Sequence, residues 1–60
     1  MTGKQVTVIL KRNGWKLDRI RGSHHVMVKP GYRSVPVPVH GSEDLGLLAK
    51  RILKEAGIEP

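Results

Sequence analysis

Apolar residues near the start of the chain recur at the spacing of an amphipathic helix. Val6, Ile9 and Leu10 share one helical face, while basic and polar residues fall largely on the opposite face. A Thr-x-x-Gln capping box spans residues 2–5, and an Asn-Gly pair, which favours a helix C-terminus, follows the periodic stretch. The pattern therefore predicts a helix over residues 3–13.

A second helical pattern lies near the end of the sequence. We predict a helix over residues 45–56, with Asp44 or Gly46 as its N-cap. Gly57 suits the cap at the C-terminal end, and Ile58 is placed to fold back onto the last turn. The stripe expected to face the core consists of Leu45, Leu48, Ile52 and Ala56.

Between the helices, residues 15–21 show an imperfect strand pattern. Trp15 and Leu17 share one face of an extended chain, but Ile20 is out of phase with them. One extra residue in the strand, a β-bulge near residues 18–19, would restore the phase. We therefore predict a strand that contains a bulge.

Two further strands are predicted, at residues 24–29 and 33–39, and turn residues precede each of them. A Gly-Ser pair at residues 22–23 forms the first turn, and a Pro-Gly pair at residues 30–31 forms the second. In the last strand, valines alternate with prolines, which have no N–H to donate to a neighbouring strand. We expect this strand at an edge of the sheet, with its valine face toward the core.

The order of these elements is helix, three strands, helix, which indicates an α+β fold. We expect an α-β-β-β-α arrangement in which both helices cover one face of a three-stranded antiparallel sheet and the other face stays open. Residues 1–60 are expected to form a single domain, because so short a chain holds only one core. The expected sensitive core sites are Ile9, Leu10, Leu48 and Ile52.

Composition and charge narrow the range of functions. The chain has no cysteine, which excludes disulfides and thiolate metal sites and fits a reducing cytoplasm. It shows no apolar run of membrane-spanning length and no signal-peptide pattern. A formal net charge of +6 on 60 residues favours polyanionic partners. Nucleic acid is favoured over a membrane, because no basic amphipathic helix carries aromatic anchors.

Candidate chemistry centres on the two histidines that follow the first predicted turn. His24 and His25 begin a strand, with Arg19 and Arg21 upstream and Lys29 downstream. Histidine gives or takes a proton near neutral pH, and cations beside it can hold a phosphate, so this cluster suits an RNA-cutting site. The alternative is that a histidine beside a turn is an exposed polar residue without a chemical role. Strand alternation places the two histidines on opposite faces of the sheet.

Four motifs resemble the HicA toxin family, in the right order and over nearly the whole chain. They are Asn13-Gly14-Trp15-Lys16-Leu17, Gly22-Ser23-His24-His25, Val37-Pro38-Val39-His40 and Ile52-Leu53-Lys54-Glu55-Ala56-Gly57-Ile58. The resemblance implies a fold similar to that of double-stranded RNA-binding domains. It also implies an mRNA interferase that a HicB antitoxin neutralises. The functional histidine of the family falls on His24, and His25 is the fallback.

The activity implied by this resemblance needs few groups. A base removes the proton of a ribose 2′-OH, and the oxygen then attacks the adjacent phosphorus while cations stabilise the crowded phosphate. His24 would be the general base or acid, and His40 is either a second proton carrier or a hydrogen-bonding loop residue. No acidic residues or histidines have the spacing of a metal site, so neither a metal nor another cofactor is expected. The residues expected to contact RNA are Arg19, Arg21, Ser23, Lys29 and Lys50.

Two other classes of function fit the same sequence. One is a non-catalytic RNA-binding domain, because the implied fold is shared with domains that read A-form shape and phosphates. Against it, residues 47–49 open the second helix with Leu-Leu-Ala instead of a dense lysine cluster. The other is a structural or adaptor protein that binds only protein. RNA binding of either kind weakens steeply as salt rises, and only an enzyme cuts the RNA that it binds.

Overall fold

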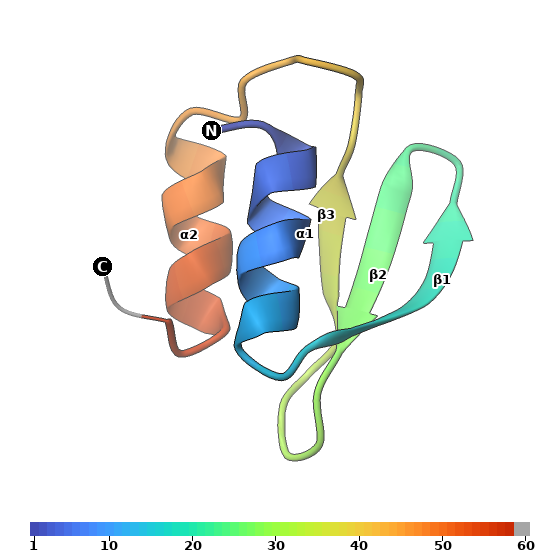
Figure 1. Ribbon diagram of the computed structural model, residues 1–60, viewed down its shortest axis with the longest axis vertical. Helices are drawn as coiled ribbons and strands as arrows, with labels where there is room; N and C mark the ends of the chain where they lie inside the picture. Colours follow the sequence, from blue (N-terminus) through green and yellow to red (C-terminus); the bar gives the residue numbers. More distant parts are fainter. Residues whose placement is uncertain (59–60) are drawn as a thin grey trace.

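Helices and strands follow one another along the chain in the predicted order. The computed structural model describes residues 1–58, and Figure 1 shows two helices beside a three-stranded sheet. The bounds of the elements are α1 Gly3–Arg12, β1 Lys16–Arg21, β2 His24–Val28, β3 Val35–Pro38 and α2 Leu47–Glu55. This order confirms the predicted α-β-β-β-α arrangement of an α+β fold, although every element is shorter than expected.

α1 begins with the capping box that the sequence predicts. The Gln5 N–H donates to the Thr2 hydroxyl (3.2 Å), and the Thr2 N–H donates to the Gln5 side-chain oxygen (2.8 Å). Gly3 follows the cap and lies against the end of β3. A Cβ at this position would stand 2.0 Å from the Pro38 carbonyl oxygen, so only glycine allows the approach that holds α1 on the sheet.

Both helices end in the same capping arrangement. At the end of α1 the Trp15 N–H donates to the Leu10 carbonyl (3.0 Å), and at the end of α2 the Ile58 N–H donates to the Leu53 carbonyl (2.9 Å). The glycines that precede Trp15 and Ile58 have φ angles of +89° and +74°. This left-handed conformation supplies donors to the last helix carbonyls and turns the chain back toward the core. The glycine caps and the inward position of Ile58 are therefore confirmed.

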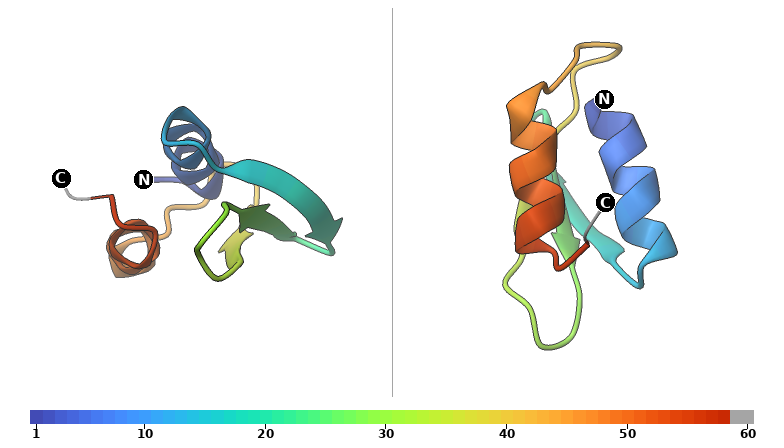
Figure 2. Two further views of the ribbon diagram at one scale, coloured as in Figure 1. Left: turned by 90° about the horizontal axis from the view of Figure 1, so that it is seen from below. Right: turned by 90° about the vertical axis from the view of Figure 1, so that its left-hand side faces the viewer.

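The three strands form one antiparallel sheet in the order β1-β2-β3. β3 lies at an edge, as its alternating prolines predict, and Val35 and Val37 point into the core while Pro36 is exposed. The two helices lie side by side over one face of the sheet (Figure 2). The opposite face, here called the open face, is covered by no other element of residues 1–58.

The predicted bulge lies in β1. Leu17 pairs with Met27 and Arg19 pairs with Val26, so Asp18 is an extra residue without a partner on β2. The interruption shifts the phase of the strand, and the side chains on either side of Asp18 therefore do not follow simple alternation. This confirms the explanation given for the imperfect apolar pattern of β1.

The core lies between the helices and the sheet. Its buried residues are Val6, Leu10, Trp15, Met27, Val35, Val37, Ala49, Ile52 and Ala56. Leu10 and Ile52 are buried as predicted, but Ile9 is only half buried, and the core assignment of Leu48 is wrong because its side chain is 41% exposed. α2 turns Ala49 into the core instead, at 3% exposure.

α2 begins later than predicted because of the conformation of Gly46, its N-cap. Gly46 has a φ of +58°, which is not helical, and its N–H donates to the Asp44 carboxylate (2.9 Å). The same carboxylate accepts a bond from the Met1 amino group (2.7 Å). This charged hydrogen bond lowers the pKa of Asp44 and ties the start of α1 to the loop before α2.

Two substitutions on α2 test which of its faces is buried. Ile52→Ala should lower the free energy of unfolding by about 2–5 kcal/mol, because it leaves a cavity between α2 and the rest of the core. Leu48→Ala, the matched control on the same helix, should cost less than about 1 kcal/mol. Denaturant unfolding measures both values. Equal losses, or a larger loss for Leu48→Ala, would contradict the observed orientation of α2.

Candidate functional site

A shallow pocket on the open face brings together several of the residues that the sequence singles out. Its volume is about 410 Å³. The residues that line it are Arg19, Arg21, His24, Val26, Ser34 and Pro36. All three strands contribute or adjoin this open-face pocket, so the sheet itself fixes the relative positions of the side chains.

The β1 bulge explains why both arginines reach this pocket. After Asp18, Arg19 stands opposite Val26 and Arg21 stands opposite His24 in the antiparallel pairing. Directly opposed residues on neighbouring strands share a face of the sheet. Val26 is 6% exposed and forms an apolar floor beside Arg19. A cationic wall beside an exposed histidine is the result.

The start of β2 holds His24 on an ordered backbone. Gly22 takes a φ of +59°, which closes the tight turn between β1 and β2. Beyond the turn, the Val39 N–H donates to the Ser23 carbonyl (2.7 Å), and His24 pairs with Pro38. At His24, β2 is therefore paired with β1 on one side and with β3 on the other, while the side chain of His24 stays exposed.

The two arginines at the pocket differ in their ion pairing. Arg19 forms an ion pair with Asp18, and both side chains are about half exposed. Arg21 takes part in no ion pair within residues 1–58. An exposed pair of this kind is screened by solvent and leaves most of the field of the guanidinium in place. The pocket is therefore positive, and Arg21 has its donors free for an anionic ligand.

The other two histidines lie elsewhere. His25 pairs with Ile20 and Val37, and Val37 is fully buried under the helices, so His25 belongs to the helix-covered face. This agrees with the expectation that His24 and His25 point to opposite faces. His40 follows β3 in an exposed loop, where its carbonyl accepts the Glu43 N–H (3.0 Å), and it does not line the pocket.

Three of the residues expected to contact RNA are also outside the pocket. The Lys29 ammonium donates to the Asn13 carbonyl (2.9 Å) and lies 5.2 Å from the centre of the Tyr32 ring. Lys29 thus joins the end of β2 to the end of α1. Ser23 is half buried in the turn, and Lys50 lies on α2 in the helical layer. The structure groups only Arg19 and Arg21 with His24.

The sequence reasoning missed the apolar and neutral residues of the pocket. Val26, Ser34 and Pro36 carry no chemical signal of their own. The alternation of β3 did offer a signal for two of them. Pro36 was expected to face away from the core, and Ser34 lies two positions before it and so shares its face. Tyr32 was also missed: its ring packs on Trp15 with centroids 5.4 Å apart, which orders the loop before β3.

Metal ions in proteins are commonly held by three or more His, Cys, Asp or Glu side chains. In the part of the chain that the structure describes, no three His, Cys, Asp or Glu side chains come together. Nor does that part contain a helix long and apolar enough to cross a membrane. The polar side chains that line the open-face pocket carry the His24 imidazole, the Arg19 and Arg21 guanidinium groups and the Ser34 hydroxyl.

The chain also matches a known family. A family model described as HicA toxin of bacterial toxin-antitoxin matches residues 3–58, which is nearly the whole chain and includes every residue of the pocket. No curated protein matches the chain significantly.

A pair of double variants tests whether the pocket contacts RNA. Arg19→Gln with Arg21→Gln should weaken binding to single-stranded RNA and reduce the slope of log affinity against log salt by about 1.4, because two phosphates are no longer neutralised. Lys11→Gln with Lys54→Gln removes the same charge from the helical layer and should change the slope little. Filter binding at several salt concentrations measures both. Equal effects would mean that RNA responds only to net charge.

Proposed function

Because the chain belongs to the HicA family of toxins from bacterial toxin–antitoxin systems, we propose that it is an mRNA interferase that cuts RNA at the open-face pocket. The observation that carries this proposal is the grouping of His24 with Arg19 and Arg21 on one uncovered face. The proposed substrate is RNA in the cytoplasm, and the formal net charge of +6 favours association with such a polyanion.

In the proposed reaction, His24 handles the proton and the arginines hold the phosphate. The imidazole takes the proton of a ribose 2′-OH, the 2′-oxygen forms a bond to the adjacent phosphorus, and the bond from phosphorus to the 5′-oxygen breaks. The leaving 5′-oxygen takes up a proton from water, and His24 later returns its proton to the solvent. The guanidinium groups of Arg19 and Arg21 stabilise the extra negative charge on the non-bridging oxygens as it develops.

The shape of the pocket suits a flexible substrate. It is shallow and open, so a single strand can lay its backbone along the sheet, whereas a deep site would demand an extruded base. The floor contains Val26 and Pro36, which offer apolar contact without hydrogen-bond readout of a base. We infer cleavage with little dependence on base identity at the pocket itself.

Substitution of each histidine in turn tests the proposed role of His24. His24→Ala should slow cleavage of a long RNA by about 10²–10⁴-fold, the usual contribution of a general base, with RNA binding retained. His25→Ala should keep most of the activity because its side chain lies on the other face. His40→Ala should fall between the two. Cleavage is followed in the presence of a chelator, and circular dichroism confirms that each variant is folded.

The three rates separate the candidate functions. Cleavage by His24→Ala at the parental rate contradicts the proposal. Loss of activity in His25→Ala alone would move the site to the helix-covered face. RNA that is bound but cut by none of the proteins, the parent included, would identify a non-catalytic RNA-binding domain. Binding to no RNA at any salt concentration would identify a protein-binding adaptor.

The partner of this toxin is a cognate antitoxin, and we propose that it is HicB-like and covers the open face. A positive pocket attracts an acidic protein surface and speeds its association. In hydrogen exchange of the toxin–antitoxin complex, amides around His24 and Arg21 should become protected relative to the free toxin. A neutralised complex in which those amides exchange as in the free toxin would indicate indirect inhibition.

A further inference from the structure

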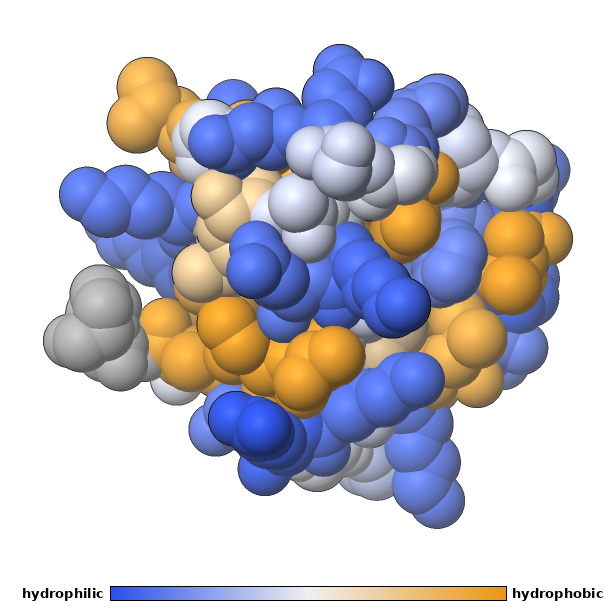
Figure 3. All heavy atoms as spheres, turned by 45° about the horizontal axis from the view of Figure 1, so that its top comes forward, coloured by the Kyte–Doolittle hydropathy of each residue, from blue (hydrophilic) through white to orange (hydrophobic). Residues whose placement is uncertain are grey.

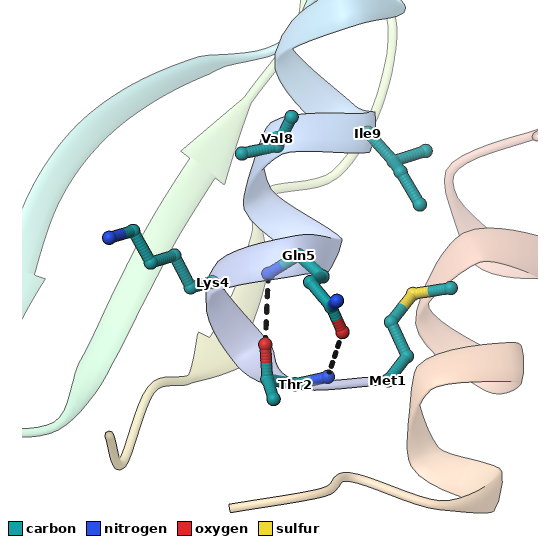
Figure 4. Close-up of a pocket in the computed structure, with 6 residues that line it drawn as sticks. All are labelled: Met1, Thr2, Lys4, Gln5, Val8 and Ile9. Carbon is teal, nitrogen blue, oxygen red and sulfur yellow. Dashed lines mark hydrogen bonds between the residues drawn. The ribbon is translucent and has the colours of Figure 1, made fainter. Parts of the chain in front are cut away.

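A second hollow lies on α1, away from the pocket that contains His24. It has a volume of about 500 Å³, within the range of sites that hold a ligand or a few side chains of a partner. Its lining residues are Met1, Thr2, Lys4, Gln5, Val8 and Ile9. We call it the α1 groove. Figure 4 shows the six side chains around the first turns of the helix, with Met1 and Ile9 extending toward α2.

The α1 groove exposes apolar side chains that the fold does not use. Val8 is 42% exposed and Met1 is 44% exposed, and Ile9 is half buried, although all three are strongly apolar. Figure 3, in which the end of the molecule where α1 begins comes forward, shows apolar surface bordered by hydrophilic side chains. An apolar patch with a polar border is typical of a surface that another protein covers.

The charged side chains of the two helices are mostly positive, and the Asp44 carboxylate beside Met1 is already bonded to the Met1 amino group (2.7 Å). α1 carries Lys4, Lys11 and Arg12 without any acidic residue, and α2 carries three further cations against one carboxylate, at Glu55. By helical spacing, Lys4, Val8 and Arg12 follow one another at intervals of four along one stripe. The groove therefore has an apolar centre with Lys4 in its lining, and Arg12 lies one turn beyond Val8 along α1.

We propose that the α1 groove binds an amphipathic helix of a protein partner, with apolar residues at helical spacing and acidic residues beside them. Helices of this kind dock into apolar grooves through side chains one turn apart. The apolar side chains of the partner cover Val8, Ile9 and Met1, and its carboxylates lie near Lys4 and Arg12. The cognate antitoxin is the partner that such a helix would come from, so this inference rests on the proposed function and adds the α1 groove to the open face as a second contact.

Other occupants fit the groove less well. RNA is recognised through phosphates, 2′-hydroxyls and stacking on aromatic rings, and no aromatic residue lines the groove. A second copy of this chain would bring the basic helices of both molecules together, which like-charge repulsion opposes. An amphipathic acidic helix can place its apolar side chains on the apolar centre and its carboxylates near the basic side chains.

A designed peptide tests the chemistry directly. The isotope-labelled protein is titrated with a peptide of roughly 15 residues that places leucines on one helical face and glutamates on the other, and amide shifts are followed by NMR. We expect shifts in Lys4, Gln5, Val8 and Ile9 and none in Arg21 or His24. Two control peptides have the same leucines with lysines, or the same composition with the leucine spacing scrambled. Neither should bind comparably.

Two substitutions at one position separate apolar contact from charge. Val8→Glu and Val8→Lys should both weaken peptide binding by about tenfold or more, because each removes the apolar contact. Leu47→Glu is the matched control: Leu47 is 78% exposed on α2 and does not line the groove. It should change peptide affinity little. Thermal unfolding confirms that the variants are folded.

Each remaining outcome overturns the proposal. Equal binding of the scrambled peptide, or tighter binding by Val8→Lys, would show attraction by charge alone. Shifts confined to the open-face pocket would place the partner there. Shifts in the groove with oligouridylate, or on dilution of the protein alone, would identify RNA or a second copy as the occupant. RNA cleavage by Val8→Glu should equal that of the parent, so failure here is distinct from failure of the proposed enzymatic function.

Discussion

The extra residue in β1 is the constraint on which the open face depends. Without a bulge at Asp18, simple alternation would turn Arg19 and Arg21 toward the helices and turn Ile20 outward, since a shift of one residue exchanges the faces of a strand. Both guanidinium groups would then lie on the face opposite His24. The bulge instead places them beside His24 on the open face. It is tolerated because β1 is an edge strand, with a neighbour on one side only.

Because both helices cover one face of the sheet, the open face and the outer surface of the helices expose different kinds of side chain. The helices and the sheet bury a single apolar core between them, which leaves the open face free for a charged, shallow pocket built on paired strands. The outer surface of the helical layer is also basic, but at the α1 groove it is apolar as well. RNA at the sheet and an acidic helix at α1 are thus compatible with one domain, because each uses side chains that the other does not contact.

Much of the fold follows from local signals in the sequence. The capping box, the two glycine caps, the bulge and the proline-bearing edge strand each depend on neighbouring residues, and each was predicted. On α2, Ile52 and Ala56 were predicted correctly as core positions, but Leu48 was chosen in place of the adjacent Ala49, because the choice depends on how α2 is rotated against the rest of the core. At the site, Arg19, Arg21 and His24 follow from strand pairing. The contact of Lys29 with Asn13 joins two loops distant in sequence, and no local pattern indicates it.

The chemical ends of the cleaved RNA test the proposed role of the open-face pocket most directly. Attack by the neighbouring 2′-OH, with His24 moving the proton, leaves a 2′,3′-cyclic phosphate on one fragment and a free 5′-hydroxyl on the other. Mass spectrometry of the fragments from a defined RNA, cut in the presence of a chelator, distinguishes these ends from those made by water. Fragments with a 2′,3′-cyclic phosphate and a 5′-hydroxyl are the predicted result. Fragments with a 5′-phosphate and a 3′-hydroxyl would contradict it.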